Sequence, residues 1–185
     1  MILLLVSCTL FHKNPSDKDV TDLPPLIVIK DCEDGVKCHY VDSNRDGKVD
    51  VVNYYRQRSG TSPLLIKREI DIDNDKDGRI DIVSHFNDMN ELVKEQIDLD
   101  YNGTFERTDH YTASRRILTE IDTNDDDEVD VRLIYEGGIV KRKEKDTNFD
   151  GDFDVFMRLN EEGLVVRYGI NTDYDEENTI DERGP

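Results

Sequence analysis

The stretch DTNFDGDFD, residues 146–154, places acidic or amide side chains at its first, third, fifth and ninth positions and glycine at its sixth. Four upstream segments share the acidic and amide positions, and the first three of them also have the glycine: DSNRDGKVD from residue 42, DNDKDGRID from 73, DLDYNGTFE from 98 and DTNDDDEVD from 122. Consecutive starts therefore lie 31, 25, 24 and 24 residues apart. A degenerate sixth segment, DYDEENTID, begins at residue 173. Self-similarity at a nearly constant period indicates a repeat protein.

These positions have a chemical reason, and the segments resemble the calcium-binding loops written D-x-D-x-D-G. Ca²⁺ takes roughly six to eight oxygen ligands, and alternate residues of a curved backbone point their side chains at one centre. Glycine permits the sharp turn, the carboxylate at position nine would close the site, and the apolar eighth residue is expected to anchor the loop to the core. The resemblance implies about four to five calcium sites. Their ligands would be Asp42, Asn44, Asp46, Asp50, Asp73, Asp75, Asp77, Asp81, Asp98, Asp100, Asn102, Glu106, Asp122, Asn124, Asp126, Asp130, Asp146, Asn148, Asp150 and Asp154.

Two of the six loops depart from the pattern. The fourth has Asp127 where glycine is expected, and a non-glycine residue with positive φ is uncommon, so we expect weaker calcium binding there. The sixth, built on Asp173, Asp175, Glu177 and Asp181, also lacks the glycine and is expected to be empty or to act as a cap. The alternative for every loop is a solvated turn that happens to be acidic.

The segments between the loops alternate apolar and polar residues, as β-strands do. After the loops come RIDIVSHF (79–86), VDVRLIY (129–135) and DFDVFMRL (152–159). Turn residues follow, and LLIKREI (64–70), LVKEQI (92–97), RILTEI (116–121) and IVKRKEK (139–145) return to the next loop. The predicted repeat is therefore strand, hairpin, strand, calcium loop.

This arrangement predicts an all-β fold, an antiparallel meander of about ten to twelve strands in a twisted or partly rolled sheet. All loops would lie along one edge and the hairpins along the other. An open barrel and a propeller are the alternatives. Strand-flanked loops of this kind are similar to FG-GAP and VCBS repeats. An EF-hand would instead need flanking helices and a glutamate at position twelve. That position holds Asn53, Ser84, Asp109, Leu133 and Met157.

Composition sets limits on partners and on the core. With 24 Lys+Arg against 43 Asp+Glu, the formal charge is -19 on 185 residues, which argues against nucleic acid and favours cations. Hydrophobic residues make up 36% and Trp is absent, so the core should be thin. Calcium would then stabilise the fold, because clustered carboxylates repel one another without it.

The N-terminus begins with an apolar run that ends at Leu5-Val6-Ser7-Cys8. This sequence resembles the lipobox of bacterial lipoproteins, which implies lipidation of Cys8 and a position in the bacterial cell envelope, at the outer membrane or cell surface. The alternative is an accidental apolar start. The predicted organisation is a signal with its lipidated cysteine (1–8), a flexible tether (9–25) and a β repeat domain (26–185).

Lipidation of Cys8 would leave Cys32 and Cys38, separated by a Glu-Asp-Gly turn. An extracytoplasmic compartment favours a disulfide between them, with two free thiols as the alternative.

No enzyme is predicted, because the histidines are scattered and no nucleophile or zinc motif occurs. The expected function is a calcium-stabilised structural or adhesive lipoprotein. The alternative is a calcium-responsive module that binds an envelope protein or polysaccharide, and an envelope hydrolase fits the sequence less well.

Overall fold

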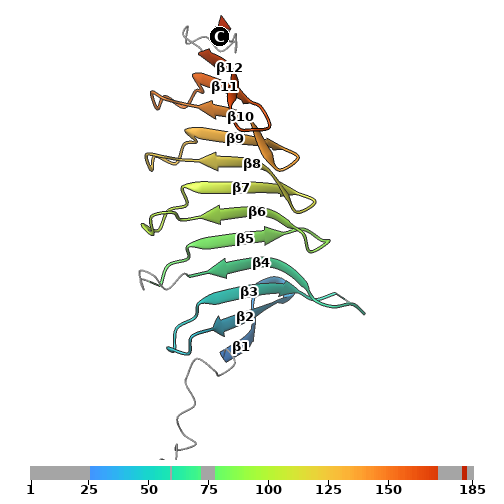
Figure 1. The fold of residues 1–185 in the computed structure, drawn as a ribbon. Helices are drawn as coiled ribbons and strands as arrows, with labels where there is room; N and C mark the ends of the chain where they lie inside the picture. The colour runs from blue at the N-terminus through green and yellow to red at the C-terminus, as the bar shows by residue number, and fades with distance from the viewer. Residues whose placement is uncertain (1–25, 59, 72–77, 171–180, 183–185) are drawn as a thin grey trace, which may run out of the picture.

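The computed structural model describes residues 26–58, 60–71, 78–170 and 181–182. In this part of the chain, thirteen strands form one antiparallel sheet in chain order (Figure 1). The elements are β1 (Leu26–Asp31), η2 (Glu33–Gly35), β2 (Val36–Asp42), β3 (Val51–Arg56), β4 (Leu64–Ile70), β5 (Ile82–Phe86), β6 (Leu92–Ile97), β7 (Arg107–Thr112), β8 (Arg115–Ile121), β9 (Val131–Glu136), β10 (Ile139–Lys145), β11 (Val155–Leu159), β12 (Val165–Ile170) and β13 (Asp181–Glu182).

The predicted all-β meander is confirmed. Each strand pairs only with its neighbours in sequence, and β1 and β13 form the two ends of an open sheet. Closure into a barrel or a propeller does not occur. The strand count exceeds the expected ten to twelve, and the set includes β1, which precedes the first loop, and the two-residue β13.

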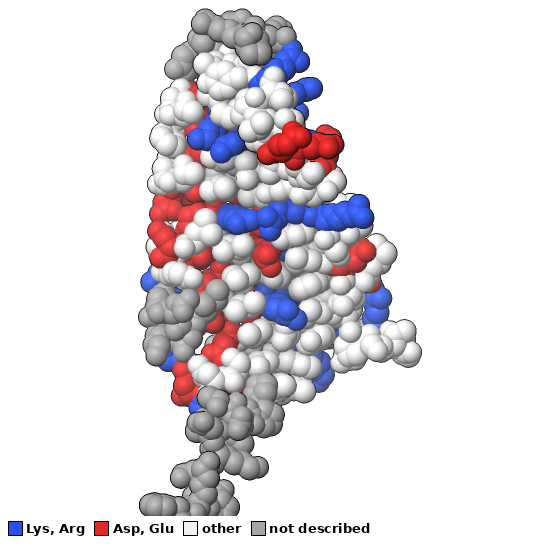
Figure 2. All heavy atoms as spheres, viewed as in Figure 1, with Lys and Arg blue, Asp and Glu red and all other residues white. Residues whose placement is uncertain are grey.

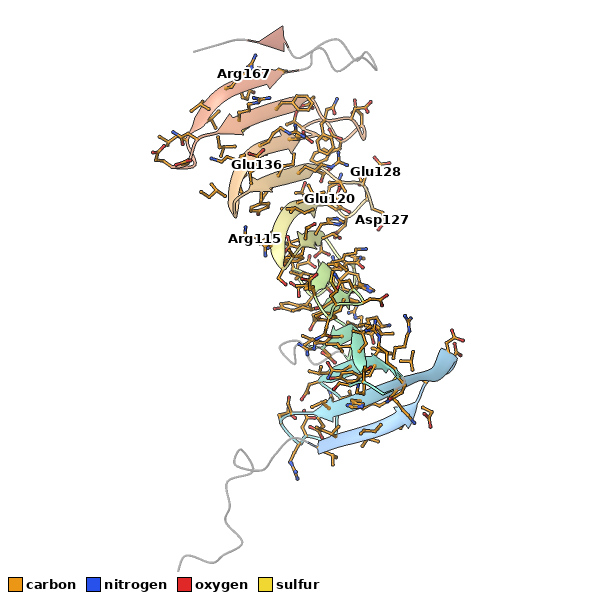
Figure 3. All side chains as sticks on the ribbon, turned by 90° about the vertical axis from the view of Figure 1, so that its right-hand side faces the viewer. Arg115, Glu120, Asp127, Glu128, Glu136 and Arg167 are labelled. Atoms are coloured by element: carbon orange, nitrogen blue, oxygen red, sulfur yellow. A yellow bond between two sulfur atoms is a disulfide. The ribbon has the colours of Figure 1, made fainter. Side chains whose placement is uncertain are left out.

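The sheet is a single twisted layer, with side chains projecting from both faces (Figure 3). A single layer cannot bury a thick apolar core, and the hydrophobic residues that are buried in the described structure are few: Cys38, Val52, Leu64, Leu65 and Val155. The thin core that the composition predicted is therefore present, and polar groups occupy many of the buried positions.

One buried polar cluster lies in the middle of the sheet, on β7 and β8. Asp109 on β7 is fully buried and forms ion pairs with Arg107 at 2.9 Å and with Arg116 at 3.1 Å. Thr119 on β8 donates a hydrogen bond to the same carboxylate at 2.5 Å. Because its charge is paired, Asp109 is tolerated in the middle of the sheet.

The strands that lead into the loops match the prediction closely, whereas those that follow the loops begin later than expected. For example, β9 starts at Val131 instead of 129 and β11 at Val155 instead of 152. The apolar residue at position eight was expected to be an anchor in the core. This was wrong for Val49 and Phe105, which are 41% and 37% exposed, because the single layer has no second layer to cover them.

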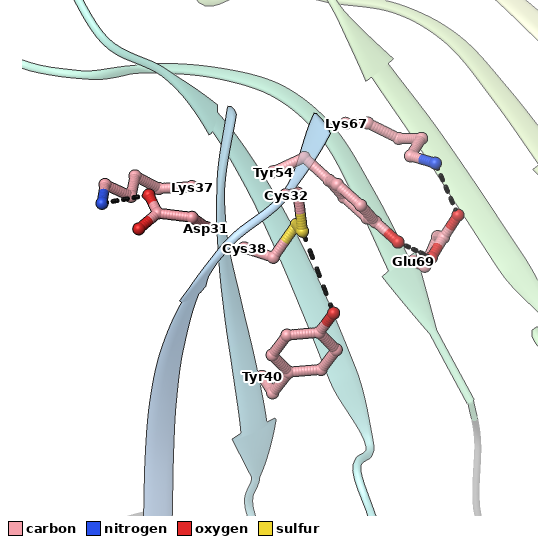
Figure 4. The surroundings of a disulfide bond; sticks show 8 residues. All are labelled: Asp31, Cys32, Lys37, Cys38, Tyr40, Tyr54, Lys67 and Glu69. Carbon is pink, nitrogen blue, oxygen red and sulfur yellow. Dashed lines mark hydrogen bonds and ion pairs between the residues drawn. A yellow bond between two sulfur atoms is a disulfide. The ribbon is translucent and has the colours of Figure 1, made fainter. Parts of the chain in front are cut away.

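Cys32 and Cys38 form the predicted disulfide, with their Cα atoms 6.0 Å apart (Figure 4). The short η2 turn between them contains Asp34 in the left-handed region, with φ of 56°. Cys38 is fully buried, so the bond fastens the end strand β1 to the sheet at its hairpin.

Several predicted residues lie outside the described part of the chain. They are Cys8, the tether, the ligands Asp73, Asp75 and Asp77, and most of the sixth loop. Among the described residues, no helix is long and apolar enough to cross a membrane.

Candidate metal-binding loops

The acidic loops that the structure describes in full lie along one edge of the sheet, and the hairpins lie along the other (Figure 1). In the space-filling view, Asp and Glu side chains gather along the loop edge, on the left (Figure 2). Four loops are fully described: the first (42–50), third (98–106), fourth (122–130) and fifth (146–154).

The carboxylate at position one organises the interior of each loop. In the third loop, Asp98 accepts backbone hydrogen bonds from Tyr101 at 2.7 Å and Gly103 at 2.8 Å. Asp146 accepts the equivalent bonds in the fifth loop, from Phe149 at 2.7 Å and Gly151 at 2.8 Å. The bond from the N–H of position six to the carboxylate of position one recurs in the other two loops. Its length is 2.9 Å in the fourth loop and 3.0 Å in the first. The backbone is therefore curled around this side chain in all four loops.

Positive φ angles at positions four and six produce the curl. The sixth-position glycines Gly47, Gly103 and Gly151 have φ of 93°, 97° and 91°, where a side chain is disfavoured. In the fourth loop Asp127 takes this place with φ of 68°, closer to the left-handed helical region that aspartate tolerates. The predicted departure is thus a real backbone difference, although Asp127 keeps the hydrogen bond to Asp122.

The carboxylate at position nine closes each loop, as its place in the motif suggested. It accepts a hydrogen bond from the backbone N–H of position two. The donors are Ser43 and Thr123, at 2.6 Å each, and Thr147, at 2.9 Å. In the third loop Leu99 donates to Glu106 at 2.6 Å. The two ends of every described loop are therefore held together by a charged side chain.

Three carboxylates converge in the third loop. Carboxylate oxygens of Asp98, Asp100 and Glu106 lie within 4.8 Å of one another. In the first loop, Asp42 is only 6% exposed, and its Oδ1 atom has no hydrogen-bond partner. A buried carboxylate oxygen without a partner is costly, and a cation would compensate it.

Consecutive loops are joined by a backbone hydrogen bond. The N–H at position one donates to the carbonyl at position nine of the preceding loop: from Asp98 to Asp81, from Asp122 to Glu106, and from Asp146 to Asp130, each at 2.8 Å. The loops therefore form a continuous stack along the edge of the sheet.

This stack identifies Asp71 as a candidate ligand that the motif alignment missed. Asp71 donates its N–H to the Asp50 carbonyl at 2.9 Å, and Asp81 donates to the carbonyl of Ile70. In the fourth and fifth loops, the residue at position one bonds to the preceding loop in the same way, and the residue at position nine bonds to the carbonyl just before position one. By backbone register the second loop thus spans 71–81. The available signal was the continued alternation in DIDNDKDG from residue 71.

Side chains also link neighbouring loops. Asn102, at position five of the third loop, donates from Nδ2 to Asp125 of the fourth loop at 2.9 Å. Desolvation and the negative charges of Asp100 and Glu106 raise the pKa of the Asp125 carboxyl. The third and fourth loops therefore share one electrostatic environment.

All candidate ligands of the motif are carboxylate or amide oxygens, which suit a hard cation such as Ca²⁺ rather than zinc or copper. No protein-family model matches the chain, and no curated protein matches it.

Proposed function

We propose that this protein is a calcium-binding structural or adhesive lipoprotein of the bacterial cell envelope. The observation that carries the proposal is the repetition of one loop conformation, with oxygen side chains at positions one, three, five and nine, along a single edge. Convergence of three carboxylates in the third loop supports it. The lipobox-like sequence ending at Cys8 is the basis for the envelope location.

Calcium would stabilise this fold because the sheet has little apolar core. Each loop holds several carboxylates whose mutual repulsion favours unfolding. Five divalent ions would add +10 to the formal charge of -19, leaving -9. A ligand that binds only the folded state stabilises that state by mass action.

A second candidate function is a calcium-responsive module that binds a protein or polysaccharide. The open single-layer sheet favours it, since side chains project from both of its faces (Figure 3). The two functions differ in affinity: structural sites fill at extracellular calcium, with Kd of ~10⁻⁴ to 10⁻³ M, whereas sensing needs micromolar sites.

The test is thermal unfolding of the full chain carrying Cys8→Ser, in calcium, in magnesium and in chelator. We expect the highest melting temperature in calcium and poor rescue by magnesium, which requires a compact octahedral shell. Calorimetric titration of the same sample gives the number of sites and their affinity. Identical melting temperatures under all three conditions would show that the loops are only acidic turns.

A further inference from the structure

One row of residues runs across twelve strands on one face of the sheet without a carboxylate. Directly paired residues in an antiparallel sheet point to the same face, so the register defines the row. We call it the basic row. Its members, from β1 to β12, are Lys30, Cys38, Tyr54, Lys67, His85, Lys94, His110, Leu118, Ile134, Arg142, Arg158 and Arg167.

The neighbouring rows show that this composition is specific to the row. On the same face, the row two residues closer to the loops contains Glu69, Glu120 and Glu144. On the opposite face, the central row contains Glu95 and Asp109. In a chain with 43 acidic residues, the basic row is thus a distinct positive track.

Part of its charge is neutralised within the sheet. Lys67 pairs with Glu69 at 2.7 Å, and Arg142 pairs with Glu144 at 2.9 Å. In the described part of the chain, neither Lys94 nor Arg158 forms an ion pair with a carboxylate. These two side chains therefore keep an uncompensated charge.

The register also places like charges opposite one another, which is unfavourable for folding alone. Arg142, Arg158 and Arg167 are directly paired across β10, β11 and β12, and all three are exposed. Farther along the row, burial and the charges of Lys94 and Lys67 lower the pKa of His85. Among the described residues, Arg158 has no ion pair that offsets this repulsion, so an external anion would recover stability there.

We propose that the basic row binds a linear acidic polysaccharide that carries a carboxylate on alternate sugars and lies across the strands. Strands are ~4.8 Å apart, so the row spans roughly 50 Å and carries a mean of one Lys or Arg in roughly 9 Å. The spacing is uneven: Lys30, Lys67 and Lys94 are roughly 14 and 10 Å apart, whereas the three arginines lie on the consecutive strands β10, β11 and β12. Nucleic acid carries one charge per ~3.4 Å along each strand, so most of its phosphates would lack a partner beside an acidic protein. A sparsely charged polymer matches the row.

The acidic loops do not prevent this binding. Arg142 lies four residues before Asp146, which is roughly 13 Å along an extended strand. The Debye length at physiological ionic strength is ~8 Å, so repulsion from the loops is largely screened at the row. Guanidinium and ammonium groups both bind carboxylates.

The test measures binding of fluorescent hyaluronan fragments by anisotropy at low and high salt, with calcium present. We expect salt-sensitive binding to the full Cys8→Ser chain and no binding of dextran. Lys94→Gln with Arg158→Gln removes one half-buried and one exposed charge and should weaken binding about tenfold, as the product of two roughly threefold losses. The matched control, Arg68→Gln with Lys143→Gln, removes two charges from the opposite face and should change affinity less than about twofold.

An equal loss of hyaluronan affinity in both double variants would overturn the proposal, as would a failure of the protein with its basic row intact to bind hyaluronan. So would equal or tighter binding of a single-stranded oligonucleotide or of poly-L-glutamate, each of which would assign a different class of ligand. Melting curves in calcium and chelator on the same variants check folding and the proposed calcium function separately. A retained calcium effect without hyaluronan binding would reject only this inference.

Discussion

The two long edges of the sheet are built differently. Along the loop edge, four described loops share positive φ angles at positions four and six and the hydrogen bond from position six to the carboxylate at position one. Along the hairpin edge, the turns vary: Ala113-Ser114 and Gly137-Gly138 are two-residue turns with positive φ, whereas Asn87 and Asn160 begin longer ones. The loop edge repeats the same side chains and hydrogen bonds from loop to loop, so its loops are under a common chemical constraint that the hairpins do not share.

Bulges show the same contrast. Of the described hairpins, β3–β4, β5–β6, β7–β8, β9–β10 and β11–β12 each contain a register shift, and only the disulfide-linked hairpin β1–β2 does not. The strand pairs joined by an acidic loop have none among the described residues. Bulges absorb an extra residue and increase local twist. The hairpin edge therefore tolerates irregularity, and the loop edge keeps the repeats in register.

The largest expected effect comes from deleting an equivalent turn-forming side chain at each edge. Asp98 accepts three backbone hydrogen bonds, from Tyr101, Asn102 and Gly103, while Asn160 at a hairpin accepts two, from Glu162 and Leu164. We expect Asp98→Ala to cost about 3 kcal/mol and Asn160→Ala about 1 kcal/mol. Denaturant unfolding in calcium measures both.

Chelator makes this comparison specific to metal. Asp98→Ala should lose less stability on chelation than the unmodified protein, because one linked site is already impaired. Asn160→Ala should lose as much as the unmodified protein. If both variants respond to chelator alike, the loop edge owes its uniformity to turn geometry and not to a cation.

A smaller effect should separate two glycines with similar backbone angles. Gly103 in the third loop has φ of 97°, and a Cβ there would lie 2.5 Å from Nη1 of Arg79, which donates to the Asn102 carbonyl. Gly163 in a hairpin has φ of 80° and nothing within 4 Å. We expect Gly103→Ala to cost about 2 kcal/mol and Gly163→Ala about 1 kcal/mol. Equal melting temperatures for the two variants would show that contact between loops adds nothing.

Much of the fold followed from the sequence because periodic carboxylates marked every second strand connection. The strands β4, β6 and β10 were predicted to the residue, since an apolar alternation runs directly into the first aspartate of the next loop. The strands after the loops were placed too early. The residues at positions eight and nine, such as Val129 and Asp130, have strand-like composition but still belong to the closure of the loop.

Other features depend on register, which the pattern alone does not give. The length of the second loop, and with it the place of Asp71, follows from the hydrogen bond to the Asp50 carbonyl. The basic row requires knowing which residues pair across all twelve strands, and bulges shift that pairing in five of the six described hairpins. A one-residue error in register would move each side chain to the other face.

The smallest expected effect concerns the fourth loop, the exception along the uniform edge. Asp127→Gly should allow φ to move from 68° toward the 91–97° of the other loops and should remove one repelling charge. We expect a gain of about 0.5 kcal/mol and calcium affinity at this site raised a few-fold, because aspartate tolerates positive φ better than most residues but less well than glycine. Asp152→Gly removes a charge at position seven of the fifth loop without changing a positive φ, and it serves as the control. If the two variants raise affinity equally in calorimetric titration, charge alone explains the gain. If only Asp127→Gly raises the affinity, the φ angle at position six limits cation binding. The affinities of the sites along the loop edge then differ because this one backbone angle differs.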